Sequence, residues 1–411
     1  MNAKKKVAVI GGGAAGMVAA ISAQRAGAAV TILEKNPRVG KKILATGNGR
    51  CNYTNLNADV PWYHGSNPSF VKGALNAFSV EKTLHFFEDL GIDPKVEEMG
   101  KVFPMSEQAS SILDVLLYEI NQLGIEVAGD TCITSVTKKG SQFELKAENG
   151  SIFQADSVIL AVGGKAMPSS GSDGYGYELA TKLGHTMTPL FPALVQIMLE
   201  GSFFQRIEGV KLVGTAEVLH QNRSLAQDRG DILFANYGVS GPPILQISRK
   251  AGELLQQGKE AVLKLSILDM PRDELAKIID RRCSANSDKT VEFCLVGLIN
   301  KRLIPVILHE AGIEDLKKPA ARVTAKERAD IVHVLTDWRF RIRGTKSWPS
   351  AQVTAGGIIT DEVDENTMQS KIVKGLYLVG EILDIDGQCG GFNLQWAWSS
   401  GYIAGKYAAL Q

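Results

Sequence analysis

The chain has 411 residues, 45% of them hydrophobic and 22% charged, which is enough for two or three folded domains with ordinary cores. The 45 Lys and Arg nearly balance the 44 Asp and Glu, and a net charge of +1 gives no overall field to attract nucleic acid or an anionic membrane. The five cysteines and six histidines show no metal-binding spacing, and no apolar run reaches the ~18 residues of a membrane helix. We therefore expect a cytoplasmic protein with no metal site, no membrane segment and no nucleic-acid partner, and with an oligomeric state that composition leaves open.

The first 34 residues predict a strand, a glycine turn, a helix and a second strand. The apolar runs Lys6–Ile10 and Ala28–Leu33 have the β-branched composition of strands, and the alanine-rich stretch Met17–Ala26 between them favours a helix. A length of about 30 residues is typical of one βαβ unit, so we expect a parallel sheet here.

The turn in this unit has the spacing of a dinucleotide-binding loop. Gly11 permits a tight turn, Gly13 lets a pyrophosphate approach the backbone, and Gly16 allows close packing of helix on strand. The helix N-terminus adds N–H groups and a partial positive charge for the phosphates. Glu34 ends the second strand, and its carboxylate can accept hydrogen bonds from ribose hydroxyls. The same carboxylate would repel a 2′-phosphate, which disfavours NADP. The glycine pattern alone is weakly specific, and its strand–helix context carries the prediction.

Further along the chain, the pattern changes character several times. Residues 70–123 favour helices, and residues 125–162 favour short strands that end in a continuous apolar run. Residues 193–268 favour strands, residues 271–343 favour helices, and the last 60 residues return to strand and helix. This order predicts a nucleotide-binding domain built from both ends of the chain.

The expected domain boundaries follow from these changes. The nucleotide-binding domain comprises residues 1–192 and 346–411, and an inserted domain occupies residues 193–345, with its β part first and its helical part second. The fold class is α/β, with a Rossmann-like domain that is split in sequence.

Two further segments favour FAD over NAD as the cofactor. The loop 40–52 places three glycines, two lysines and an arginine directly after the first βαβ unit, where it can line a phosphate and the ribityl chain; the alternative is a solvated basic loop. Residues 380–394 follow a strand near the C-terminus and lead into the last helix, whose N-terminus can stabilise charge on the flavin ring. No second GxGxxG opens a βαβ unit. The segment Ala161–Lys165 ends a strand, but it resembles the FAD-side loop of such folds and not an NAD fingerprint. A nicotinamide is therefore expected only as a transient co-substrate, NAD(P)H.

These segments resemble the BaiN-like and aminoacetone-oxidase-like family of FAD-binding proteins. The motifs that carry the resemblance are Gly11–Gly16 with Glu34, Gly47–Asn55, Phe234–Pro242, Val353–Gly357 and Gly380–Leu394. The resemblance implies FAD bound without a covalent bond on the split domain, and a backbone contact from Ile133 to the adenine.

The residues predicted to contact FAD come from the glycine loop, the basic loop and three strand ends. They are Gly11, Gly13, Ala14, Ala15, Gly16, Glu34, Lys35, Lys41, Lys42, Thr46, Gly47, Asn48, Gly49, Arg50, Cys51, Asn52, Ile133, Gly163, Gly164, Gly380, Glu381, Asp386, Gly391, Asn393 and Leu394.

The sequence leaves the reaction open between several hypotheses. In one, NAD(P)H reduces the flavin and N5 delivers hydride to a small electron-poor alkene such as an enone; in another, an amine is oxidised and oxygen reoxidises the flavin. A non-catalytic flavin-binding or redox-sensing protein is a further alternative, and a tRNA-modifying protein lacks support from the net charge.

No catalytic residue is assigned from the sequence. The enone route needs a proton donor, for which Tyr237, His185 and Tyr53 are available by residue type. Cys51 and Cys389 lie in flavin-adjacent segments, and we interpret both as buried, inert thiols.

Overall fold

The computed structural model describes residues 4–284 and 289–410. Contacts within the chain divide it into two compact units: unit 1 comprises Met1–Phe191 and Trp348–Gln411, and unit 2 comprises Pro192–Ser347. Each unit has a hydrophobic core of its own.

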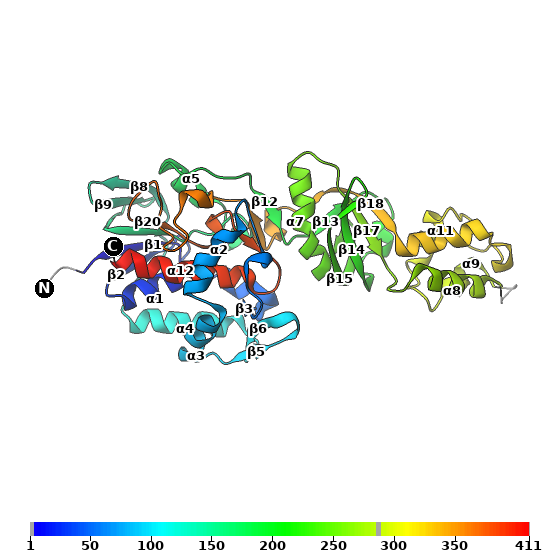
Figure 1. Ribbon diagram of the computed structural model, residues 1–411, viewed down its shortest axis with the longest axis horizontal. Coiled ribbons are helices and arrows are strands. Elements are labelled where there is room, and N and C mark those ends of the chain that lie inside the picture. The colour runs from blue at the N-terminus through cyan, green and yellow to red at the C-terminus, as the bar shows by residue number, and fades with distance from the viewer. Residues whose placement is uncertain (1–3, 285–288, 411) are drawn as a thin grey trace. The chain divides into compact units, whose positions relative to one another are not determined.

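A parallel sheet of five strands, in the order β20-β11-β1-β2-β7, forms the centre of unit 1 (Figure 1). The strands are β1 (Lys6–Ile10), β2 (Ala29–Leu33), β7 (Glu126–Ala128), β11 (Ser157–Leu160) and β20 (Leu376–Leu378). Val9 pairs with Ile159 on one side and Ile32 on the other, and all three are fully buried. Burial on both faces explains the continuous apolar runs in the sequence. This sheet confirms the predicted α/β, Rossmann-type fold.

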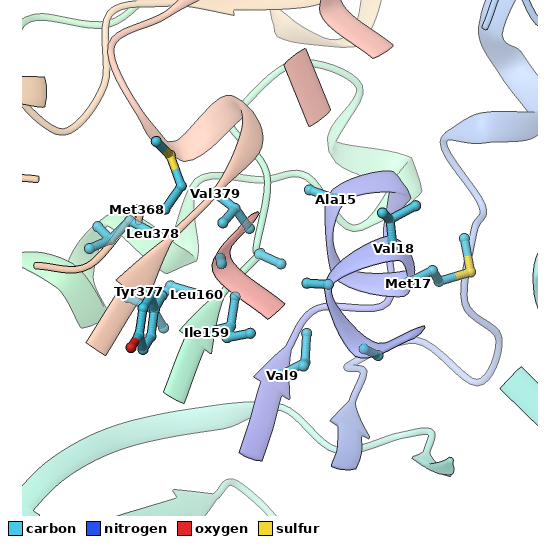
Figure 2. Packing of buried hydrophobic residues seen from close by; sticks show 14 of the residues in the cluster. Val9, Ala15, Met17, Val18, Ile159, Leu160, Met368, Tyr377, Leu378 and Val379 are labelled. Atoms are coloured by element: carbon cyan, nitrogen blue, oxygen red, sulfur yellow. The ribbon is translucent and has the colours of Figure 1, made fainter. Parts of the chain in front are cut away.

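Two helices from opposite ends of the chain pack closely against each other. Helix α1 (Ala14–Arg25) follows β1, and α12 (Phe392–Leu410) ends the described chain. A Cβ on Gly405 of α12 would lie 2.1 Å from the Ala19 carbonyl oxygen of α1, so only glycine permits this approach. Figure 2 shows side chains of α1 in the same core as those of β1, β11 and β20. A helix buried on all sides has no polar face, which is why α1 is alanine-rich throughout.

Smaller elements complete unit 1. They are β3 (Thr54–Asn55), β4 (Tyr63–His64), β5 (Pro94–Val96), β6 (Lys101–Pro104), β8 (Ile133–Lys139), β9 (Gln142–Ala147), β10 (Ile152–Ala155), β19 (Val353–Ala355), β21 (Asp386–Gly387), α2 (Val71–Ala77), α3 (Val80–Asp89), α4 (Ala109–Gln122) and α5 (Tyr175–Lys182), with β12 (Phe191–Ala193) at the boundary. The segment 70–123, expected to favour helices, holds α2, α3 and α4 but also two strands, since β5 pairs with β6 and β6 pairs with β3. Such short strands depend on their partners and have little periodicity of their own.

Unit 2 contains a closed antiparallel barrel of six strands. In order around the barrel these are β13 (Ile197–Leu199), β16 (Gly238–Ser240), β15 (Arg223–Ala235), β14 (Lys211–His220), β17 (Val262–Ser266) and β18 (Trp338–Thr345), which pairs back to β13. On β18, Trp338, Phe340 and Ile342 are buried and the arginines between them are exposed. Closure leaves no free sheet edge.

The helices of unit 2 correct the expected division into a β part followed by a helical part. They are α6 (Phe204–Ile207), α7 (Pro242–Gln256), α8 (Arg272–Ser284), α9 (Val291–Leu295), α10 (Ile304–Glu310) and α11 (Ala325–Thr336). Helix α7 lies within the segment expected to be strands, and its buried Ile244, Ile247, Ala251 and Leu254 recur at helical spacing. Strand β18 lies at the end of the segment expected to be helical, because the barrel needs it to close. Among the described residues, none of the helices has both the length and the apolar character needed to cross a membrane.

Candidate functional site

The glycine loop lies at the carboxyl end of β1, the edge at which parallel α/β sheets bind ligands. Gly11 has φ +101°, and a Cβ there would lie 2.5 Å from the Ala161 carbonyl oxygen; a Cβ on Gly16 would lie 1.9 Å from the Gly11 carbonyl oxygen. A Cβ on Gly13, in contrast, would meet nothing within 4 Å. Two glycines are therefore required by packing, and Gly13 faces open space.

Helix α1 begins at this open side, and its N-cap makes no side-chain hydrogen bond. Its N-cap, Gly13, has no side chain to accept a hydrogen bond, and the first turn contains no acidic residue. The first N–H groups of a helix have no partner within the helix, and they carry a partial positive charge. The geometry suits a phosphate group.

Glu34 is held against the glycine loop by hydrogen bonds to both of its carboxylate oxygens. The Gly12 N–H donates to Oε2 at 2.7 Å, and Asn36 donates to Oε1 from its backbone N and from Nδ2, each at 2.8 Å. The residue is buried, with 7% of its surface exposed. A carboxylate oxygen accepts more than one hydrogen bond, so this position remains compatible with a ribose hydroxyl as a further donor.

Three segments meet beside the sheet edge through Glu381, which follows β20. Lys42 Nζ lies 2.6 Å from Glu381 Oε2, and the Thr354 N–H donates to Glu381 Oε1 at 2.8 Å. Thr354 Oγ1 in turn accepts hydrogen bonds from the N–H groups of Lys165 and Ala166, at 2.7 and 2.9 Å. Glu381 thus positions the basic loop against the β11 and β19 loops.

Thr354 was not among the residues predicted for the site. It lies inside the Val353–Gly357 motif, which the family resemblance had singled out without assigning a role. A Cβ on Gly164 would lie 2.4 Å from Thr354 Oγ1, so this glycine is needed for the contact. Only this geometry identifies the threonine, because a single Thr within a short strand carries no signal.

The basic loop has an unusual backbone between Thr46 and Cys51. Gly47 and Asn48 adopt left-handed conformations with φ of 55° and 56°, and Gly49 follows with φ +84°. These three residues are exposed, whereas Cys51 is fully buried, and burial raises the pKa of its thiol to about 12. Cys51 therefore agrees with the interpretation as an inert thiol. Cys389 does not, since it is exposed in the turn before α12.

Arg50, one of the residues predicted to contact FAD, has a side chain that contacts two carboxylates. Its Nη2 lies 2.5 Å from both Glu97 Oε1 and Glu107 Oε1, and the guanidinium lies 4.1 Å from the centre of the Phe103 ring. Lys95 also contacts Glu107. This cluster raises the pKa of Arg50, chiefly through its hydrogen bond to Glu97. The side chain anchors the basic loop to the β5–β6 segment.

The remaining predicted residues are distributed around the same unit. Lys35 pairs with Asp173 at 2.7 Å, and Ile133 is fully buried at the start of β8. Asn393 exchanges two hydrogen bonds of 2.8 Å with the Gly387 backbone and so fixes the turn before α12.

Two of the three candidate proton donors are core residues. His185 has a fully buried side chain, with Nδ1 2.9 Å from Glu362 and Nε2 2.9 Å from Ser370, and burial lowers its pKa. Tyr53 is also fully buried, and burial raises its pKa. Tyr237 is half-buried in unit 2, with Lys346 Nζ 4.6 Å from its ring centre. Burial raises the pKa of Tyr237 as well, so its hydroxyl stays protonated at neutral pH.

Comparison with known proteins places the chain in a family. The HI0933-like protein Rossmann domain matches residues 5–407. A 3-dehydro-bile acid Δ(4,6)-reductase of Clostridium scindens is 40% identical over 407 residues, which cover 98% of this chain and 99% of the relative. A ribosomal RNA dihydrouridine synthase of Escherichia coli is 30% identical over 398 residues, with 97% and 96% covered.

A solved structure has the same fold across the whole chain. The 3-ketosteroid Δ4-(5α)-dehydrogenase of Rhodococcus jostii superimposes with a TM-score of 0.51 at 18% identity, covering 100% of this chain and 98% of that one. The family match and the full-length relatives confirm the predicted family and enzyme class. The chain therefore belongs to the HI0933-like Rossmann-domain family of flavoprotein oxidoreductases.

Proposed function

We propose that the protein binds FAD without a covalent bond and reduces a carbon–carbon double bond conjugated to a carbonyl group, with NAD(P)H as the electron source. The observation that carries this proposal is the 40% identity to a 3-dehydro-bile acid Δ(4,6)-reductase over 98% of this chain. That name describes double bonds next to a ketone. A small organic enone is the substrate class that fits.

The residues of unit 1 supply a binding site for the adenosine diphosphate part of FAD. The open side of Gly13 and the N-terminus of α1 suit the pyrophosphate, and Glu34 suits the ribose. Bound FAD supplies hydride transfer at N5. Lys42, held by Glu381, brings a positive charge to the same sheet edge.

Reduction of an enone also requires a proton at the carbon that does not receive hydride. His185 and Tyr53, the candidates in unit 1, have fully buried side chains, so the donor is assigned to neither. A general acid of this kind contributes about 10²–10⁴-fold to a rate.

A second candidate applies the same chemistry to a uracil ring in RNA. The uracil C5=C6 bond is conjugated to a carbonyl group, and two relatives that are 30% and 31% identical are ribosomal RNA dihydrouridine synthases. The expectation of no nucleic-acid partner rested on the net charge of the whole chain. Unit 2, however, contains 24 Lys and Arg against 19 Asp and Glu, a net charge of +5, whereas unit 1 contains 21 against 25, a net charge of −4. Such asymmetry favours a polyanionic partner for unit 2.

Anaerobic stopped-flow spectroscopy tests the proposal. We expect the flavin to be released by acid precipitation, to be identified as FAD, and to be bleached rapidly by NADH or NADPH. A steroid 4,6-dien-3-one then reoxidises it in the absence of oxygen.

Three other outcomes would contradict the proposal. Bleaching by aminoacetone but not by NAD(P)H, followed by reoxidation with oxygen, would identify an amine oxidase. Inertness to every reductant would identify a flavin-binding protein without catalysis. Reoxidation by an rRNA transcript but not by the steroid would select the second candidate.

A further inference from the structure

A small hollow with an exposed aromatic ring lies in the helical part of unit 2. Its volume is about 230 Å³, it is open to solvent, and it is lined by Thr290, Glu292, Phe293, Val296, Lys301, Ile304 and Lys317. We call it the Phe293 hollow. Val296 and Ile304 belong to the core contacts of this unit, whereas Phe293 does not.

Phe293 presents an aromatic ring at the surface of unit 2. The residue is 53% exposed. Its ring already has a cationic neighbour, since Lys289 Nζ lies 5.2 Å from the ring centre. An exposed ring beside cations is the arrangement on which a nucleic-acid base stacks while its phosphates find positive charge.

The charges around the ring support an anionic ligand. Lys317 pairs with Glu292 at 2.9 Å, but the Lys301 ammonium has no carboxylate partner within residues 4–284 and 289–410. The hollow therefore has a free cation next to the ring. It also belongs to the unit with a net charge of +5.

We propose that the Phe293 hollow is a binding site for single-stranded RNA, in which one base stacks on Phe293 and Lys301 contacts an adjacent phosphate. This rests on the RNA candidate given under Proposed function and names the residues that would hold the RNA. A steroid fits the hollow less well, because ligand sites bury most of an apolar molecule and this hollow has an exposed wall and two lysines.

A fluorescence-anisotropy titration of the full-length, FAD-loaded protein tests the site. The probe is a fluorescein-labelled, uridine-rich single-stranded RNA of about one site size, up to about 16 nucleotides. We expect salt-dependent binding. Phe293→Ala should weaken it about tenfold. Lys301→Ala should weaken it too, and should lower the slope of log K against log salt concentration by about 0.7.

The matched control is Lys326→Ala. This substitution removes the same charge from the helical part of unit 2. Lys326, however, pairs with Asp330 on α11 and does not line the hollow. We expect its RNA affinity to stay within twofold of that of the wild type.

The site is wrong if the wild-type protein does not bind the probe at low salt, or if Phe293→Ala and Lys301→Ala bind as the wild type does. Equal losses in all three variants would also overturn it, because they would indicate diffuse charge attraction. Flavin bleaching by NAD(P)H is measured on the same preparations, so that RNA binding and flavin reduction are judged independently. A protein that binds RNA through the hollow without flavin reduction would contradict the function alone.

Discussion

At the scale of single residues, Arg50 shows why charge alone does not identify a partner. Arg50 lies in a glycine-rich loop predicted to contact FAD, and two carboxylates 47 and 57 residues away hold its guanidinium. Arginine binds carboxylates and phosphates with the same fork of donors, so the sequence cannot distinguish them. Gly16 is more predictable, because the carbonyl oxygen against which it packs belongs to Gly11 in the same loop.

The glycine loop gives a matched pair of substitutions. Gly16→Ala places a Cβ 1.9 Å from the Gly11 backbone oxygen and should lower the free energy of unfolding by about 1–3 kcal/mol, even without cofactor. Gly13→Ala meets no protein atom within 4 Å, so it should change the stability of the apoprotein by less than about 0.5 kcal/mol. It should nevertheless weaken FAD binding, because the added methyl group occupies the open side of the loop. Chemical denaturation and FAD titration measure the two effects. Equal losses of stability would contradict these separate roles.

At the scale of elements, the contact between α1 and α12 joins the two ends of the chain. Gly401 and Gly405 are spaced one turn apart, and a Cβ on either would lie 2.3 or 2.1 Å from a carbonyl oxygen of α1. On the facing helix, the small alanine side chains of α1 also permit this close approach. The last helix is thereby held next to the first turn of α1, where phosphate binding is expected.

Gly405→Ala should force these helices apart. Because the obstacle is backbone rather than a flexible side chain, we expect the free energy of unfolding to fall by about 1–3 kcal/mol. Lys406→Ala, at an exposed position of the same helix, is the control and should have little effect. Thermal unfolding followed by circular dichroism compares the two. A Gly405 variant as stable as the control would mean that the helices can separate without cost.

At the scale of the whole molecule, two units with separate cores carry opposite net charges. Their values of −4 and +5 cancel in the composition, which hides the asymmetry from any argument that uses the total. The predicted FAD contacts all belong to unit 1, and the Phe293 hollow belongs to unit 2.

Calorimetry should therefore resolve two unfolding transitions. FAD at about 100 times its dissociation constant should stabilise unit 1 by about 2.7 kcal/mol, because only its folded form binds the cofactor. The transition of unit 2 should stay in place. Scans of apoprotein with and without FAD measure both. One transition that moves as a whole would show that the two units unfold together.

The sequence by itself determined the parts of this protein that depend on short-range order. β1, the glycine turn, α1, β2 and Glu34 lie within 29 residues, and strand and helix periods with glycine geometry suffice to predict them. The Rossmann-type fold followed from that unit, and the comparisons confirmed it.

Only the tertiary structure decided which distant groups meet. Lys42 and Glu381 are 339 residues apart, and the backbone N–H of Thr354 donates to the same Glu381 carboxylate. Strand β18 forms because it pairs with two other strands and so closes the barrel. Helix α7 was missed within a β segment for the related reason that neighbouring strands outweighed its own periodicity. The exposure of Phe293, and the lack of a carboxylate partner for Lys301 among the described residues, likewise depend on what packs around them. Periodicity describes the chain locally, whereas burial and pairing are properties of the folded whole.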